Sequence, residues 1–178
     1  MRRPLLLSAI AVTAVMLSSF GGAATAAQDR SKLKIPGGLA FSEFKGYQGW
    51  EVVAPSQVKD GIKIIAANPV MMKAYKAGLP ADGKTFPNGS KVVKIEWAQT
   101  QSKVSPYFVM VPGALMSVSF IEKDTVRFPK THGWAYAQFL YDPASHTLKP
   151  SGTGASCGYA CHTAVAAKDY IFTAYPPR

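Results

Sequence analysis

The chain has 178 residues, with 20 lysines and arginines against 10 acidic residues and a formal net charge of +10 at pH 7. Such a surplus favours anionic partners or a membrane surface, but the basic residues are scattered and not interleaved with aromatic side chains, so nothing indicates a nucleic-acid partner. The sequence also lacks a phosphate-cradling glycine loop, a dinucleotide signature and a nucleophile–histidine–carboxylate set, which argues against the common nucleotide-binding and hydrolase classes.

The N-terminus has the pattern of a secretory signal. Arg2 and Arg3 precede an apolar run over residues 5–17, and small residues follow at 21–27. The run is too short to span a bilayer comfortably, and no second apolar segment follows it. We therefore expect residues 1–27 to be a cleaved signal peptide. Residues 28–178 should form a single periplasmic or secreted domain, with no stable membrane insertion after cleavage.

The rest of the chain is predicted to be rich in β-strands. Residues 28–40 are polar and contain Gly and Pro, so we expect a loosely packed leader there. Beyond it, β-branched and aromatic residues recur between turn signals. They predict strands over residues 50–54, 62–66, 90–97, 108–111, 115–121 and 134–141.

Two helices and a turn are expected among these strands. Asn68 as N-cap and Pro69 at the first helical position predict a helix that continues to residue 77, with Gly78 as its C-cap. A turn is expected near residues 124–128. A second helix is expected from about Cys157 towards residue 167. Many strands with few helices predict an α+β fold, a predominantly antiparallel β-sheet packed against helices on one side.

The segment SCGYACHT, residues 156–163, holds the only two cysteines of the chain, with three residues between them and a histidine after the second. Covalent haem attachment needs two thiols, which add to the porphyrin vinyl groups, and an adjacent histidine as axial ligand of the iron. On a helix, Cys157 and Cys161 would lie at i and i+4 on one face, with Cβ atoms about 5–6 Å apart. The spacing is therefore compatible with a C-terminal helix that holds a c-type haem through Cys157 and Cys161, with His162 on the iron.

Other interpretations of the motif stay open on spacing alone. In an oxidising compartment Cys157 and Cys161 could form a disulfide, although helical i,i+4 geometry would strain it. A zinc site would need two more ligands, and His132 and His146 are the only other histidines. If haem is bound, the sixth ligand of an electron-transfer cytochrome could be any of four methionines, of which the spacing selects none: Met71, Met72, Met110 and Met116.

The sequence around the motif resembles the cytochrome P-460 family. The resemblance is carried by GWAYAQF (133–139), by the cysteine motif and by AKDYIFTAY (167–175), and upstream by ANP and AYK within residues 67–76 and by FPNGSKVVK (86–94). The family's usual motif has a shorter spacer between the cysteines. The resemblance implies a periplasmic c-type haem protein, mostly β and commonly a homodimer. The family includes enzymes that oxidise hydroxylamine and cytochromes c′-beta that bind nitric oxide.

Within this resemblance, Lys94 corresponds to a lysine that is covalently bonded to the porphyrin in the family's enzymes. The predicted strand places Lys94 on one face with Val92 and Glu96, opposite a second face formed by Val93, Ile95 and Trp97. A haem that covered the Lys94 face would partly desolvate the amine and bring it against the ring. The resemblance thus implies haem c cross-linked to Lys94.

The distal side of the site is assigned by the same comparison. The basic residue near the open iron position in the hydroxylamine-oxidising members corresponds to Lys63, and the acidic one to Ser119. Serine cannot act as a carboxylate base. Glu96 or Glu122 could substitute for it only if the strand register differs from this alignment.

Together these features predict a c-type haem protein that oxidises hydroxylamine, or a related small nitrogen species, at a five-coordinate haem and passes electrons to another cytochrome. Lys94 and Lys63 are the expected catalytic residues. The alternatives are a nitric oxide-binding protein like cytochrome c′-beta, an electron-transfer cytochrome without catalysis, and a haem-free secreted domain with a Cys157–Cys161 disulfide.

Overall fold

The computed structural model describes residues 27–81 and 83–178. The signal peptide predicted at residues 1–27 therefore lies outside the described residues, apart from Ala27. Within the described part of the chain, no helix is both long and apolar enough to cross a membrane.

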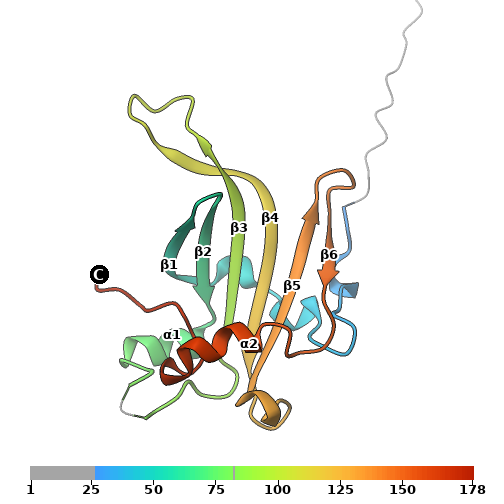
Figure 1. Ribbon diagram of the computed structural model, residues 1–178, viewed down its shortest axis with the longest axis vertical. Coiled ribbons are helices and arrows are strands. Elements are labelled where there is room, and N and C mark those ends of the chain that lie inside the picture. Colours follow the sequence, from blue (N-terminus) through green and yellow to red (C-terminus); the bar gives the residue numbers. More distant parts are fainter. Residues whose placement is uncertain (1–26, 82) are drawn as a thin grey trace, which may run out of the picture.

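The fold is built on one antiparallel sheet of six strands, each paired with its neighbour in the sequence (Figure 1). The α+β fold with a predominantly antiparallel sheet is thus confirmed. The hairpin between the third and fourth strands extends beyond the rest of the sheet. The strands are β1 (Glu51–Val58), β2 (Gly61–Ala67), β3 (Lys91–Gln101), β4 (Met110–Lys123), β5 (Trp134–Asp142) and β6 (Thr147–Ser151).

Two details of the strands differ from the sequence prediction. The segments expected at residues 108–111 and 115–121 form one strand, β4, because Pro112 and Gly113 lie within a continuous strand whose pairing to β3 is irregular rather than broken. The strand β6 was not predicted. It is a short edge strand that contains Pro150, and such strands carry little sequence signal.

The helix predicted after Asn68 is confirmed as α1, Pro69–Lys76. The Asn68 side chain accepts a hydrogen bond from the Met71 N–H over 3.1 Å, and Gly78 adopts the left-handed conformation with φ of 82° that commonly follows a helix end. The turn expected at residues 124–128 also forms, with the Phe128 N–H bonded to the Asp124 carbonyl and the 3₁₀-helix η4 (Pro129–Thr131) following it.

The N-terminal segment covers one face of the sheet. It contains three 3₁₀-helices, η1 (Arg30–Lys32), η2 (Phe41–Phe44) and η3 (Tyr47–Gly49). The expectation of a loosely packed leader at residues 28–40 is wrong, because Ile35 and Leu39 are fully buried in the core on this face. The hydrophobic gain from these two side chains outweighs the polar composition of the segment around them.

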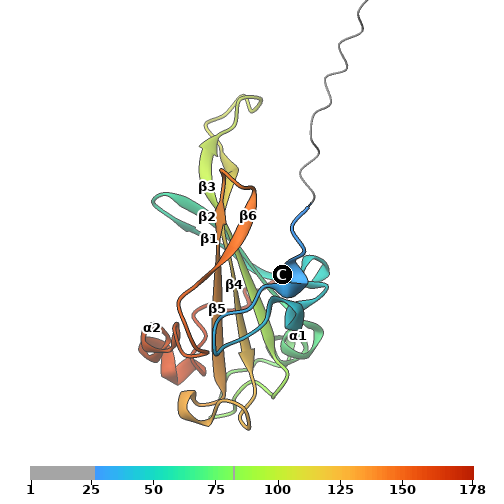
Figure 2. The same cartoon turned by 90° about the vertical axis from the view of Figure 1, so that its right-hand side faces the viewer.

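The opposite face packs against α1 and the C-terminal segment. Met71, Met72 and Tyr75 of α1 share a core there with Trp134 and Ile171. Figure 2 shows the C-terminal helix α2 and the N-terminal segment on opposite sides of the sheet. The core that α1 shares with the C-terminal segment agrees with the predicted packing of helices on the sheet, but the prediction omits the 3₁₀-helices of the N-terminal segment.

Candidate functional site

The segment that carries the cysteines is a turn followed by a short helix. Helix α2 spans Tyr159–His162 and leads into the 3₁₀-helix η5, Thr163–Lys168. The expected helix start at Cys157 is therefore wrong. Cys157 lies in the preceding turn, where the Tyr159 N–H donates to the Ser156 carbonyl over 2.9 Å. The argument that both thiols share one helical face does not apply, since only Cys161 is in the helix.

Close packing against β5 explains this turn. Gly158 is the N-cap of α2, and a Cβ atom at this position would come within 2.7 Å of the Tyr136 ring. Glycine therefore lets the backbone lie directly on Tyr136.

Both thiols are free and exposed, so the structure contains no Cys157–Cys161 disulfide.

A cavity of about 580 Å³ lies between the sheet and the C-terminal segment. Its size is within the range of about 300–1,000 Å³ that is usual for ligand pockets. Strands β1 to β5 contribute one wall, and the turn, α2 and the C-terminal residues contribute another. The cavity brings together the six positions that the sequence assigned to one site: Lys63, Lys94, Ser119, Cys157, Cys161 and His162.

His162 is half-buried and its ring orientation is fixed. Its Nδ1 is hydrogen-bonded to the Tyr170 carbonyl at 2.6 Å, so Nδ1 carries the proton and Nε2 is left as the ligating atom. The rings of Tyr136 and Phe172 lie 4.7 and 4.9 Å from the imidazole. Burial lowers the pKa of His162, and the charge of Lys94 lowers it further, although the Tyr170 hydrogen bond opposes this. The neutral form, which can bind a metal, is therefore favoured.

Lys63 and Lys94 share one carboxylate. Lys63 Nζ lies 3.4 Å from Glu96 Oε1 and Lys94 Nζ lies 3.6 Å from Glu96 Oε2. Lys63 pairs with Glu96 across β2 and β3, and Lys94 pairs with Ser119 across β3 and β4. Glu96 is thus paired with both cavity lysines in this strand register, although its own side chain does not line the cavity.

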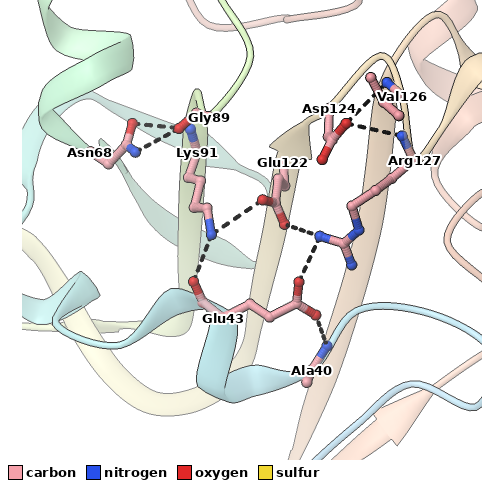
Figure 3. A network of polar contacts seen from close by, with 9 residues as sticks. All are labelled: Ala40, Glu43, Asn68, Gly89, Lys91, Glu122, Asp124, Val126 and Arg127. Atoms are coloured by element: carbon pink, nitrogen blue, oxygen red, sulfur yellow. Dashed lines mark hydrogen bonds and ion pairs between the residues drawn. The ribbon is translucent and has the colours of Figure 1, made fainter.

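Glu122 lies on the other face of the sheet and cannot take this role. Its carboxylate is bonded to Lys91 at 3.3 Å and to Arg127 at 3.5 Å, and Arg127 is bonded in turn to Glu43 of the N-terminal segment (Figure 3). Strand alternation separates the two carboxylates, since Lys91 and Glu122 face one side and Lys94 and Ser119 the other.

The residues of the cavity fit a c-type haem. Two free thiols and a neutral imidazole whose Nε2 can ligate iron are the donor set that such a haem requires. Ser119 Oγ is buried at the cavity and has no hydrogen-bond partner among the described residues. A buried hydroxyl in this state is typical of a wall that meets a bound group.

The other interpretations of the motif gain no support. The described residues contain no group of three or more His, Cys, Asp or Glu side chains arranged to hold a metal ion, as a zinc site would need. His132 stacks on Tyr170 with ring centroids 5.0 Å apart, and His146 is bonded to the Tyr141 hydroxyl. The four candidate methionines are absent from the cavity lining. Met71 and Met72 are buried in the core beside α1.

The fold and this cavity together define a haem-binding class of protein. Residues 44–173 match the family model of cytochrome P-460, and the chain belongs to this family. It is accordingly a c-type haem protein that binds iron through its haem. A search of curated proteins found no match.

Several residues of the cavity were not predicted. Gly158, Tyr136 and Phe172 line it, and the Tyr170 carbonyl fixes His162. Tyr136 and Phe172 belong to segments that carry the family resemblance, GWAYAQF and AKDYIFTAY. The signal was therefore present, but single aromatic residues inside a β-rich sequence are more often core residues, and Tyr136 is also part of the core.

Proposed function

We propose that the protein is a periplasmic c-type haem protein that oxidises hydroxylamine, or a related small nitrogen species, and delivers the electrons to another cytochrome. The observation that carries the proposal is the cavity in which Cys157, Cys161 and His162 face the lysines of β2 and β3. Bound haem would supply a redox-active iron with one open position for the small nitrogen compound.

Cys157 and Cys161 are the proposed attachment residues. Each thiol would add across one vinyl group of a bound haem, with sulfur on one carbon and hydrogen on the other, so no separate oxidant would be needed. The turn before α2 accommodates the extra residue between the cysteines. The helix therefore needs to present only Cys161, because Cys157 lies in the turn. His162 Nε2 would bind the iron, oriented by the hydrogen bond at Nδ1.

Lys94 is the proposed residue for a covalent link to the ring. It lines the cavity with about a third of its side chain exposed, so its amine is accessible from the cavity. Forming an N–C bond removes one hydrogen from the amine and one from the ring, and a two-electron oxidant such as a peroxide would accept them. The ion pair with Glu96 would hold the amine in place before this bond forms.

Glu96 is the proposed proton acceptor of the site. Oxidation of hydroxylamine releases protons, and Ser119 cannot bind them as a carboxylate would. Glu96 is about 15% exposed and is held by Lys63, Lys94 and the Ser117 hydroxyl. Lys63 would then orient the carboxylate towards the cavity, a positioning role rather than proton transfer.

The test is made with the full chain expressed alongside a c-type haem maturation system. The expected result is colour that resists acid-acetone extraction, a strongly red-shifted main absorption band and hydroxylamine-dependent reduction of an added electron acceptor. Replacing Lys94 with Ala should abolish the red shift. Haem-loaded protein without hydroxylamine-dependent reduction would contradict the catalytic part of the proposal.

A nitric oxide-binding protein like cytochrome c′-beta is the second candidate. It is favoured by Ser119, which leaves no carboxylate at the position opposite Lys94, and by the ion pair that occupies the Lys94 amine. Here the same thiols and histidine hold the haem, but Lys94 stays unlinked. An ordinary c-type spectrum with tight nitric oxide binding would support it. An electron-transfer cytochrome is less favoured because no methionine among the residues that the structure describes lines the cavity.

By family resemblance the protein is also proposed to be a homodimer. Light scattering of the haem-loaded protein tests this directly, and a mass of one chain would exclude it.

A further inference from the structure

We infer that the buried ion pair between Lys123 and Asp169 is a positioning device for His162, acting through the backbone carbonyl of Tyr170. The inference rests on the proposed function, because it concerns how the chain holds the histidine that would bind the haem iron. Neither residue of the pair lies in the haem attachment motif.

The Asp169 carboxylate is enclosed and fully hydrogen-bonded. The side chains of Lys123 and Asp169 are 3% and 4% exposed. Lys123 Nζ donates to both carboxylate oxygens, at 2.7 and 2.5 Å. The Phe86 N–H donates at 2.8 Å and Trp134 Nε1 at 3.2 Å. Donors from β4, from β5 and from the segment before β3 therefore fix this one side chain, and a network of this kind is rigid when every member is paired.

The backbone at Asp169 and Tyr170 is in a conformation that needs such support. Asp169 has a φ of 49° and Tyr170 a φ of 62°. Two consecutive residues with side chains in the left-handed region are uncommon, because the Cβ atom meets the neighbouring peptide. Such geometry persists only where the surroundings enforce it. The carboxylate network supplies that enforcement at the first of the two residues.

The turn has a direct consequence for His162. It directs the Tyr170 carbonyl at Nδ1 of the imidazole, which donates to it over 2.6 Å. A carbonyl in this place selects the tautomer with Nε2 unprotonated, fixes the ring orientation and increases the donor strength of Nε2. Lys123 lies on the same face of β4 as Ser119 and Ile121, which line the cavity. One strand thus forms part of the cavity wall and also anchors the histidine.

A purely structural role makes a different prediction. If the pair only fastens the C-terminal segment to the sheet, removing it lowers stability without changing the bond between iron and His162. The two roles are therefore separated by a property of that bond and not by activity or by stability.

The experiment replaces Asp169 with Asn in the haem-loaded protein. Asparagine tolerates the left-handed region and can still accept from the Phe86 N–H, but it cannot neutralise Lys123. The expected result is a shift of the iron–histidine stretching band of the reduced protein to lower frequency in resonance Raman spectra, with a rise in the midpoint potential. Both follow from a weaker hydrogen bond at Nδ1 and a weaker donor at Nε2.

The matched control is Glu122→Gln, which breaks the ion pair between a buried glutamate and Lys91 on the opposite face of the same strand. It should lower stability and leave the band in place. An unmoved band in Asp169→Asn overturns the inference. If that variant yields no haem-loaded protein, Lys123→Gln, which keeps a donor to the carboxylate, is measured in its place with the same two outcomes. A wild-type protein without any iron–histidine band would instead contradict the proposed function.

Discussion

Two clusters of charged residues occupy opposite faces of the central strands, and their charges are compensated to different degrees. On the face covered by the N-terminal segment, Lys91 and Arg127 are matched by Glu43 and Glu122 (Figure 3). On the cavity face, Lys63 and Lys94 share Glu96 alone.

The two clusters also differ in what covers them. Lys91 Nζ donates to the Glu43 carbonyl at 2.8 Å, so the first cluster is fastened to the N-terminal segment. The second faces a cavity and carries one positive charge in excess. A compensated cluster that is covered by the chain itself contributes stability and fold specificity, whereas an uncompensated one at a cavity is suited to an anionic or redox-active partner. We therefore infer that the charged residues on the covered face stabilise the fold, and that those on the cavity face take part in the chemistry of the site.

The largest expected effect is a loss of turnover when the charge of Glu96 on the cavity face is removed. Replacing Glu96 with Gln removes the proposed proton acceptor but keeps its size, and we expect hydroxylamine-dependent turnover to fall by about 10²-fold or more. Steady-state kinetics of the haem-loaded protein measures this. Glu122→Gln is the control, and its turnover should stay near that of the wild type. Equal losses in both variants would show that the two faces do not differ in chemistry.

The next largest effect is on stability. Here Glu122→Gln should lose more than Glu96→Gln, the reverse of their order for turnover. Glu122 has a side chain 9% exposed and two cationic partners, so Glu122→Gln should lower the free energy of unfolding by about 2 kcal/mol. Glu96→Gln should cost less, because its lysine partners retain access to the cavity. Urea denaturation of both variants measures the difference. A larger loss for Glu96→Gln would contradict the structural role given to the covered face.

A smaller effect is expected at Asn68, which joins α1 to the start of β3. Its side chain accepts from the N–H groups of Met71 and Lys91 and donates to the Gly89 carbonyl. Asn68→Ala should destabilise the protein by about 1–2 kcal/mol through loss of this cap. The iron–histidine band and the absorption spectrum should be unchanged, because Asn68 does not line the cavity. Asn68→Asp, which keeps the cap acceptor, should recover part of the lost stability.

The sequence predicts the cavity better than it predicts the elements around it. Strand alternation places Lys94 and Glu96 together, and the family resemblance places Lys63, Ser119 and the cysteine motif. Lys63, Lys94, Ser119 and the cysteine motif do meet in one cavity, and Glu96 lies beside the two lysines. The predicted helix start at Cys157 was wrong, because the actual start of α2 at Tyr159 depends on the contact between Gly158 and Tyr136, which are far apart in the sequence.

The prediction of a loosely packed N-terminal segment was wrong for a related reason. Its polar composition masks Ile35 and Leu39, whose burial depends on the sheet face that the segment covers and not on their neighbours in the chain. The left-handed turn at Asp169 and Tyr170 has no local signal either, since its support comes from Lys123, Phe86 and Trp134. Local patterns thus predict which residues share a strand face, while long-range polar contacts determine turns and the fixed orientation of His162.

The smallest expected effect is the pH dependence of the stability that Glu43 contributes on the covered face. Burial raises the pKa of Glu43, but hydrogen bonds from the Ala40 N–H and Arg127 outweigh it, so the pKa lies below the ordinary value of 4.5. A carboxyl whose pKa is lower in the folded state adds stability above the unfolded value and loses it as the pH falls below about 4.5. The stability difference between wild type and Glu43→Gln should therefore shrink between pH 5 and pH 3, as measured by urea denaturation at each pH. A stability difference that stays constant would mean that the contacts of Glu43 do not depend on its charge. The covered cluster would then be held by packing of the N-terminal segment and not by its compensated charges.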